Sequence, residues 1–257
     1  MKDRMPNVEG SVNLRDFGGY ASELGGSVVR DRLYRCGTLH YLTDEGVEAL
    51  DGLDIHLICD LRRPDEREGE PTPDTAKGKH HLEVPIDPGS AIEMRNRLND
   101  ETLGLDERVD FMTRLTSELT RDHADDYAIM FDALIGLDEG GFLVHCSAGK
   151  DRTGVAVALI LHALGVPKNT VLDDYLATNI ATDYEGFVLP HLVKKYEKHV
   201  TGISREAIMA VAGVREAYLE AAYAEIDARF DDVEHYIYDA VGVTKSDLSR
   251  LRDRYLQ

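Results

Sequence analysis

The sequence is poor in cysteine, in basic residues and in long apolar runs. Its 257 residues include 3 cysteines, and 48 acidic residues outnumber 29 basic ones, for a net charge of -19. An acidic surface repels nucleic acid and anionic membranes at long range, so no nucleic-acid partner is expected. The longest apolar stretch, residues 155–164, falls well short of the ~18 residues of a membrane span. It predicts a core helix, and no integral membrane segment is expected.

The cysteines Cys36, Cys59 and Cys146 lack the CxxC or Cys/His spacing of a zinc site. We expect free thiols in a reducing compartment, with no metal and no cofactor. A reversible disulfide between Cys59 and Cys146 is conceivable, and core burial of Cys59 is the simpler interpretation. The first residues lack the apolar core of a signal peptide, which predicts a cytoplasmic protein, with export without a signal peptide left open.

Hydrophobic patterning predicts one α/β domain over residues 1–257, with a central, mostly parallel sheet flanked by helices. Residues 62–74 are expected to be a polar loop, and residues 168–257 a helical C-terminal part. Thr43 is a plausible N-cap of a helix. The expected strands are 27–29, 33–35, 55–61, 80–86 and 141–145, and further helices are expected within 91–138 and over 152–164.

The chemistry concentrates in "HCSAGKDRTG", residues 145–154. The strand before it delivers Cys146 to the carboxyl edge of the sheet, where ligands bind in open α/β folds. A helix then begins near Arg152, and its free N–H groups and positive dipole end favour an anion. The small residues Ser147, Ala148 and Gly149 let the backbone curl into an oxyanion cradle, which favours the thiolate form of Cys146.

The spacing of cysteine and arginine selects among anion-binding loops. Arg152 lies six positions after Cys146 and can hold two oxygens of a tetrahedral anion, whereas Cys36 and Cys59 lack an arginine at that spacing. A Walker A loop is excluded, because Val144 and Asp151 stand where it needs Gly and Ser or Thr. Thiolate, amides and guanidinium together indicate phosphoryl transfer from a phosphate monoester through a phosphocysteine. A rhodanese-like sulfurtransferase, an arsenate reductase and a phosphate-binding pseudophosphatase stay open as alternatives.

The same loop resembles the signature of cysteine-dependent protein tyrosine phosphatases. More narrowly, the chain resembles the bacterial tyrosine and lipid phosphatases of the mycobacterial protein tyrosine phosphatase B type. Supporting stretches run through nearly the whole chain: "NLRDFGGY" (13–20), "LYRCGTL" (33–39), "CDLRRPDERE" (59–68), "DDYLATN" (173–179) and "GVREAYLEAAYAEID" (213–227). The resemblance implies a tyrosine phosphatase-like fold.

The resemblance also implies a role for each loop residue. Cys146 is the nucleophile, and Arg152 binds the phosphoryl oxygens together with the amides of residues 147–152. Thr153 offers a hydroxyl to the thiolate, and His145 orients the loop from behind. Asp60, at the end of a strand, is expected to orient arginines beneath the site.

A general acid must protonate the leaving oxygen, and two aspartates compete for that role. Asp87 opens a loop after a strand, where the superfamily carries its mobile acid. Asp151 lies inside the cradle, where myotubularin-like lipid phosphatases carry theirs. We favour Asp87, although either residue could have a structural role instead.

Lys150 adds positive charge to the cradle and keeps phosphoinositide substrates open, because some phosphoinositide phosphatases carry lysine there. A phosphoprotein, most simply one bearing phosphotyrosine, is the first expectation, with inorganic phosphate as product. Dual or triple specificity is the alternative, and the oligomeric state is not predicted. In the subfamily, the region similar to residues 88–125 forms a helical lid. Here "AIEMRNRL" and "DERVDFMTRL" could do the same, or could pack permanently on the sheet.

Overall fold

The computed structural model describes residues 2–73, 80–90, 103–190 and 203–257. They form a five-stranded sheet with the strand order β1-β2-β5-β3-β4. The β1 and β2 strands are antiparallel, and the other neighbours are parallel. The predicted mostly parallel sheet is confirmed. The strands are β1 (Arg15–Asp16), β2 (Leu33–Cys36), β3 (Ile55–Asp60), β4 (His80–Glu83) and β5 (Gly141–His145).

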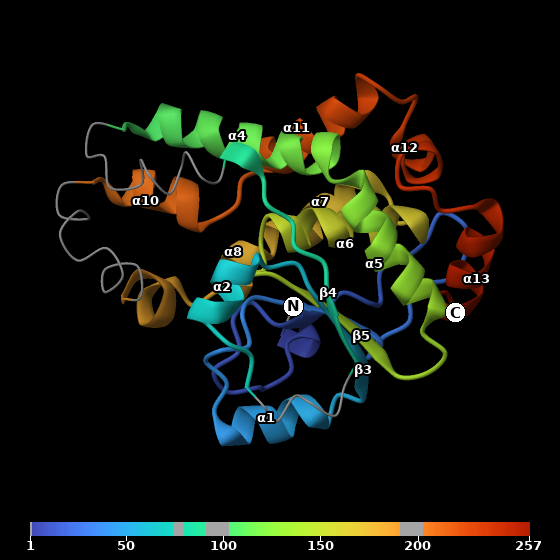
Figure 1. The fold of residues 1–257 in the computed structure, drawn as a ribbon, viewed down its shortest axis with the longest axis horizontal. Coiled ribbons are helices and arrows are strands. Elements are labelled where there is room, and N and C mark those ends of the chain that lie inside the picture. Colours follow the sequence, from blue (N-terminus) through green and yellow to red (C-terminus); the bar gives the residue numbers. More distant parts are fainter. Residues whose placement is uncertain (1, 74–79, 91–102, 191–202) are drawn as a thin grey trace.

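Helices cover both faces of this sheet (Figure 1). On one face, α1 packs with the N-terminal segment on a small apolar cluster that includes Leu50, Ile58 and Leu143. On the other face lies the main core, to which β5 contributes Phe142 and Val144. The helices are α1 (Asp44–Asp51), α2 (Pro64–Gly69), α4 (Leu105–Asp122), α5 (Ala124–Gly136), α6 (Arg152–Ala163), α7 (Lys168–Leu176), α8 (Thr178–Ala181), α10 (Arg205–Ala212), α11 (Glu216–Asp227), α12 (Val233–Asp239) and α13 (Lys245–Tyr255), with short turns of helix at Lys2–Arg4 and Tyr184–Val188.

The central β5–α6 unit follows directly from its sequence. All five residues of β5 are buried, as expected for a strand covered on both faces. The α6 helix is apolar on nearly every side, and it ends before Gly165, which adopts a φ of 73°. Glycine at that position and Pro167 just beyond are ordinary helix stop signals. The predicted strand and helix on either side of the cysteine loop are therefore confirmed.

Two local predictions were wrong. The expected strand at 27–29 is reduced to isolated bridges, in which Ser27 pairs with Ala21 and Val28 with Leu256. The expected polar loop after β3 contains α2 instead. Pro64 opens that helix, and the Glu66 carboxylate accepts a hydrogen bond from the Arg63 backbone N–H at 2.9 Å. Proline at the first position and acidic residues in the first turn are helix-start signals, but they are easily overlooked in so short a helix.

The helices after β4 pack against the C-terminal part of the chain. The buried face of α4, which includes Phe111, Met112 and Leu119, belongs to the main core. The Tyr236 hydroxyl donates a hydrogen bond to the Thr120 carbonyl at 2.9 Å, which joins α4 to α12. The "DERVDFMTRL" stretch of α4 thus packs on the core in this structure, and a lid role for residues 88–125 stays a prediction. The "AIEMRNRL" segment, residues 91–98, lies outside the described residues.

The C-terminal end of the chain pairs with residues 27–29. The Val29 N–H donates to the Tyr255 carbonyl at 2.8 Å, and the Gln257 N–H donates to the Ser27 carbonyl at 2.9 Å. The described part of residues 168–257 is helical, in agreement with the sequence pattern. No helix among the described residues is long and apolar enough to cross a membrane.

Candidate active site

The cysteine loop joins β5 to α6 at the carboxyl edge of the sheet. Cys146 follows the last residue of β5, and α6 begins at Arg152. The loop lies on the end of β2, where the Thr38 N–H donates to the Ser147 carbonyl at 2.8 Å. Gly149 has a φ of 67°, and a Cβ there would lie 2.4 Å from the Cys36 carbonyl. Only glycine fits this close approach without displacing β2. The loop is therefore a tight curl with little room to relax.

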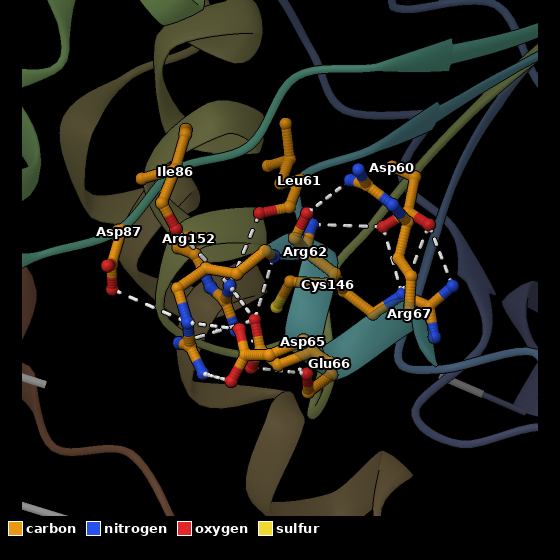
Figure 2. A network of polar contacts seen from close by, with 12 residues as sticks. Asp60, Leu61, Arg62, Asp65, Glu66, Arg67, Ile86, Asp87, Cys146 and Arg152 are labelled. Carbon is orange, nitrogen blue, oxygen red and sulfur yellow. Dashed lines mark hydrogen bonds and ion pairs between the residues drawn. The ribbon is translucent and has the colours of Figure 1, made fainter. Parts of the chain in front are cut away.

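Arg152 is held by a carboxylate that the sequence did not reveal. Its Nη1 lies 2.7 Å from Glu66 Oε2, and its Nη2 lies 2.8 Å from Oε1 (Figure 2). Glu66 also accepts a hydrogen bond from the Ser147 hydroxyl at 2.7 Å. Burial works against ionisation of Glu66, but the hydrogen bonds and charge of Arg152 outweigh it and lower the pKa of Glu66 to about 2. The bidentate pair thus locks the guanidinium plane.

The remaining N–H groups of the same guanidinium differ in their hydrogen bonds. Nη1 also donates to the Leu61 and Ile86 carbonyls, at 3.2 and 3.3 Å. Among the described residues, Nε has no hydrogen-bond partner, and Nη2 has only Glu66 and a long contact of 3.5 Å to Ser147 Oγ. The Nε–Nη2 edge is therefore the donor pair that Arg152 can offer to an anion.

Asp60 organises a second buried pair on the opposite side of Cys146 in the view of Figure 2. Arg62 donates to both Asp60 oxygens, with Nη2 2.7 Å from Oδ2. Burial opposes ionisation of Asp60, but His145 and the hydrogen bonds from Arg62 outweigh it and hold the Asp60 pKa below its usual value. Asp60 is therefore paired with Arg62, and its orienting role stays a prediction.

His145 ends β5 directly before Cys146, and Thr153 is the second residue of α6. His145 is fully buried, and burial lowers its pKa to about 4, so the imidazole is neutral at pH 7. Its Nδ1 lies 3.3 Å from the Cys146 carbonyl oxygen. The Thr153 hydroxyl is buried in the first turn of α6 and has no hydrogen-bond partner among the described residues. An unpartnered hydroxyl there is able to donate to a nearby anion.

The two candidate acids lie in different surroundings. Asp87 follows Ile86, whose carbonyl contacts Arg152, and its side chain is 43% exposed. One Asp87 oxygen lies 3.5 Å from Arg63 Nε. The side chain of Asp151 is 18% exposed and contacts Lys150 Nζ at 2.8 Å. The Lys150 side chain is buried, and its ammonium group is paired with Asp151 within the loop.

Four further residues at the loop were not singled out from the sequence. Glu66 lies in the overlooked helix α2, and its helix-start pattern was the available signal. Asn13, Arg35 and Asp174 fall in stretches noted only for their resemblance to a family. Local patterns do not show that they meet beneath Gly149, because they lie far apart in the sequence.

A thiol beside an arginine fork, at the carboxyl edge of a mostly parallel sheet, defines an α/β protein that can bind an anion next to a cysteine. Comparison with known proteins identifies the family. The model of the tyrosine phosphatase family matches residues 6–257. The chain belongs to this family, whose members are phosphatases, and it is an enzyme of the hydrolase class.

Individual relatives agree with the family assignment. A Cupriavidus necator protein provisionally named as a tyrosine-protein phosphatase is 32% identical over 95% of this chain and 85% of its own length. The Mycobacterium tuberculosis triple specificity protein phosphatase PtpB is 27% identical over 79% of this chain and 73% of its own length. The crystal structure of Pseudomonas aeruginosa TpbA covers 82% of this chain and 91% of its own length, with 15% identity and a TM-score of 0.34, too low for a shared fold to be inferred from it.

Proposed function

We propose that the protein hydrolyses phosphate monoesters through a phosphocysteine on Cys146, with phosphotyrosine in proteins as the first substrate. The observation that carries this proposal is the arginine fork beside the thiol. Glu66 occupies one edge of the Arg152 guanidinium, and the Nε–Nη2 edge is left for two phosphoryl oxygens. The backbone N–H groups of residues 147–152 complete the cradle.

In the first step, the Cys146 thiolate attacks phosphorus. The S–P bond forms as the P–O bond to the leaving group breaks, and the general acid gives its proton to the departing oxygen. In the second step, water attacks phosphorus, the S–P bond breaks and inorganic phosphate leaves. The same carboxylate takes the proton of that water. Thr153 can donate its hydroxyl to the departing sulfur, which eases this step.

We assign the acid to Asp87. Its exposed carboxyl group follows Ile86, which contacts Arg152, so it can reach the leaving oxygen of a bound ester. Asp151 is held by Lys150, which suits a supporting role in the loop. The Lys150–Asp151 pair also leaves no free loop ammonium to select a lipid headgroup, and this favours phosphotyrosine over phosphoinositides.

The test is hydrolysis of p-nitrophenyl phosphate in the presence of EDTA. Wild-type protein is expected to be active, and Cys146→Ser to have no measurable turnover while still binding inorganic phosphate. Full activity in Cys146→Ser would refute the phosphocysteine. An inactive wild type that binds phosphate would indicate a pseudophosphatase, and thiosulfate or arsenate turnover in its place would indicate another thiol enzyme. Rates on phosphotyrosine peptide, phosphoserine peptide and phosphoinositides then rank the substrates, and a faster rate on phosphoinositides would reverse the preference.

A further inference from the structure

The Gly149 carbonyl oxygen is gripped from beneath by two distant side chains. Asn13 Nδ2 donates to it at 2.8 Å, and Arg35 Nη2 donates to it at 2.9 Å. An oxygen that accepts two such bonds cannot face a bound anion. Because the peptide bond is planar and trans, the N–H of Lys150 points the opposite way from this carbonyl. The grip on Gly149 therefore turns one N–H of the loop away from Asn13 and Arg35.

Asn13 and Arg35, which hold the Gly149 carbonyl, are themselves in contact with buried charged side chains. Arg35 Nη1 lies 2.6 Å from Asp174 Oδ2, and Arg15 Nε lies 3.5 Å from Asp174 Oδ1. Arg15 also donates to the Asp174 carbonyl at 2.9 Å and to the side-chain oxygen of Asn13. The three charged side chains are at most 2% exposed. We call these four residues the floor cluster: Asn13, Arg15, Arg35 and Asp174.

The floor cluster contains two guanidinium groups and one carboxylate, so it holds one positive charge that no carboxylate within it balances. Burial and the charge of Arg35 lower the pKa of Arg15 to about 10, which still leaves Arg15 charged at pH 7. The Tyr20 hydroxyl, 3.0 Å from Asp174, is neutral and does not change this balance. A buried, unbalanced charge is unfavourable unless an anion lies nearby.

The other cations around the loop are matched by carboxylates. Among the described residues near Cys146, the thiol of Cys36 and the hydroxyl of Tyr127 have pKa values raised chiefly by burial and stay neutral at pH 7, as does His145. The Arg63 guanidinium contacts three carboxylates, those of Asp65, Glu66 and Asp87. Glu66 is shared with Arg152, and three other cations each have a carboxylate partner: Arg62 with Asp60, Lys150 with Asp151, and Arg67 with Glu83.

We propose that the floor cluster is a positioning device for the cysteine loop: Asn13 and Arg35 set the Gly149 peptide, and the excess charge of Arg15, Arg35 and Asp174 favours the Cys146 thiolate and the bound phosphoryl group. This inference rests on the proposed phosphatase function. It goes beyond it by placing the unbalanced positive charge beneath the loop, on residues that do not touch substrate.

Two substitutions change the cluster charge in opposite directions. Arg15→Met leaves one guanidinium and one carboxylate, and it keeps both donors to Gly149. Asp174→Asn keeps nearly the same shape and removes the negative charge. The readout is the ultraviolet absorbance of the thiolate as a function of pH, with each variant measured against the same variant carrying Cys146→Ser. This subtraction removes the signals of Cys36 and Cys59.

We expect Arg15→Met to raise the pH midpoint of the Cys146 titration by about one unit, and Asp174→Asn to lower it. One unit is the size that a buried charge several Å away produces at an effective dielectric constant near 20. The inhibition constant of inorganic phosphate should rise about tenfold in Arg15→Met for the same reason. Loss of packing alone would not shift the two midpoints in opposite directions.

Asn13→Gly tests the grip on the carbonyl separately from the charge. Asn13 has a φ of 55°, which glycine adopts without strain, and the substitution leaves all three charges in place. We expect weaker phosphate inhibition with a nearly unchanged titration midpoint. The matched control is Arg252→Met on α13, which removes a hydrogen bond of 2.8 Å to Ala163 and should alter neither readout.

The outcomes separate this inference from the proposed function. An inactive wild type would refute the phosphatase, while the thiolate titration would still measure the effect of the cluster. An active wild type whose midpoint stays fixed in Arg15→Met and Asp174→Asn would refute the charge role. If neither variant folds, the positioning role is tested by Asn13→Gly alone. Unchanged phosphate inhibition in that variant would overturn the positioning role.

Discussion

The cysteine loop has charged groups on two sides, and they differ in exposure and in charge balance. The rim pair, Glu66 and Arg152, is partly exposed, with side chains 18% and 11% accessible. The floor cluster is almost completely buried. The rim pair is neutral as a whole, whereas the floor cluster has one positive charge in excess. We infer that the two groups have different roles. Glu66 orients the hydrogen-bond donors of Arg152, whereas the floor cluster fixes the loop conformation and supplies a positive electrostatic potential.

Replacement of the rim arginine should have the largest effect on catalysis after loss of the nucleophile itself. Arg152→Lys keeps the charge but removes the planar fork that can bind two phosphoryl oxygens while paired with Glu66. We expect kcat/KM for p-nitrophenyl phosphate to fall by about 10²–10³-fold. Steady-state kinetics measure this, with a melting curve to confirm folding. A loss below tenfold would mean that a positive charge at position 152 is enough for catalysis. The rim would then act through charge alone, as proposed for the floor cluster.

The next largest effect on catalysis is expected from replacement of the general acid, for which Asp87 and Asp151 are the candidates. Asp87→Asn should lower kcat by about 10²-fold on a substrate with a poor leaving group, and should flatten the basic limb of the pH profile. Asp151→Asn is the matched comparison, because it frees Lys150 without removing the exposed carboxyl group. A larger kcat loss in Asp151→Asn would transfer the acid role to the loop itself.

Glu66→Gln sharpens the comparison from the rim side. The glutamine can still accept a hydrogen bond from Arg152 but has no charge, so it holds the guanidinium less firmly. The rim pair then has a net charge of one positive unit, as the floor cluster does. We expect kcat/KM to fall by about tenfold, the value of one charge-assisted hydrogen bond. Phosphate inhibition should become tighter or stay the same, since the rim then has a net positive charge. Much weaker phosphate binding would show that Glu66 is needed mainly for geometry.

The same variant tests the acid stability of the rim. The pKa of Glu66 is lowered from 4.5 to about 2, so its ionised form stabilises the native state fully above pH 4.5. That contribution, on the order of 3 kcal/mol, is lost as pH falls from 4.5 toward 2. The difference in unfolding free energy between wild type and Glu66→Gln should therefore be constant at neutral pH and shrink in that window. Denaturant unfolding at a series of pH values measures it, and a constant difference down to pH 2 would contradict the lowered pKa.

The sequence was a good guide wherever a property depends on neighbours along the chain. The buried run of β5, the helix start at Arg152 and the stop at Gly165 all follow from local patterns, and the structure confirms them. The strand expected at 27–29 was wrong because its backbone partners lie in separate segments, at Ala21 and at Leu256. Helix α2 was missed because a polar, six-residue helix has no apolar periodicity.

The sequence by itself determined the loop, since Cys146 and Arg152 are six positions apart between a strand and a helix that their own residues specify. It also pointed to the phosphatase family and to both candidate acids. Only the tertiary structure decided which carboxylate holds Arg152 and which donors hold Gly149, because Glu66, Asn13 and Arg35 reach the loop across separations of 86, 136 and 114 positions. Such contacts arise from packing of the sheet and its neighbours, and no local pattern encodes which distant charges will meet.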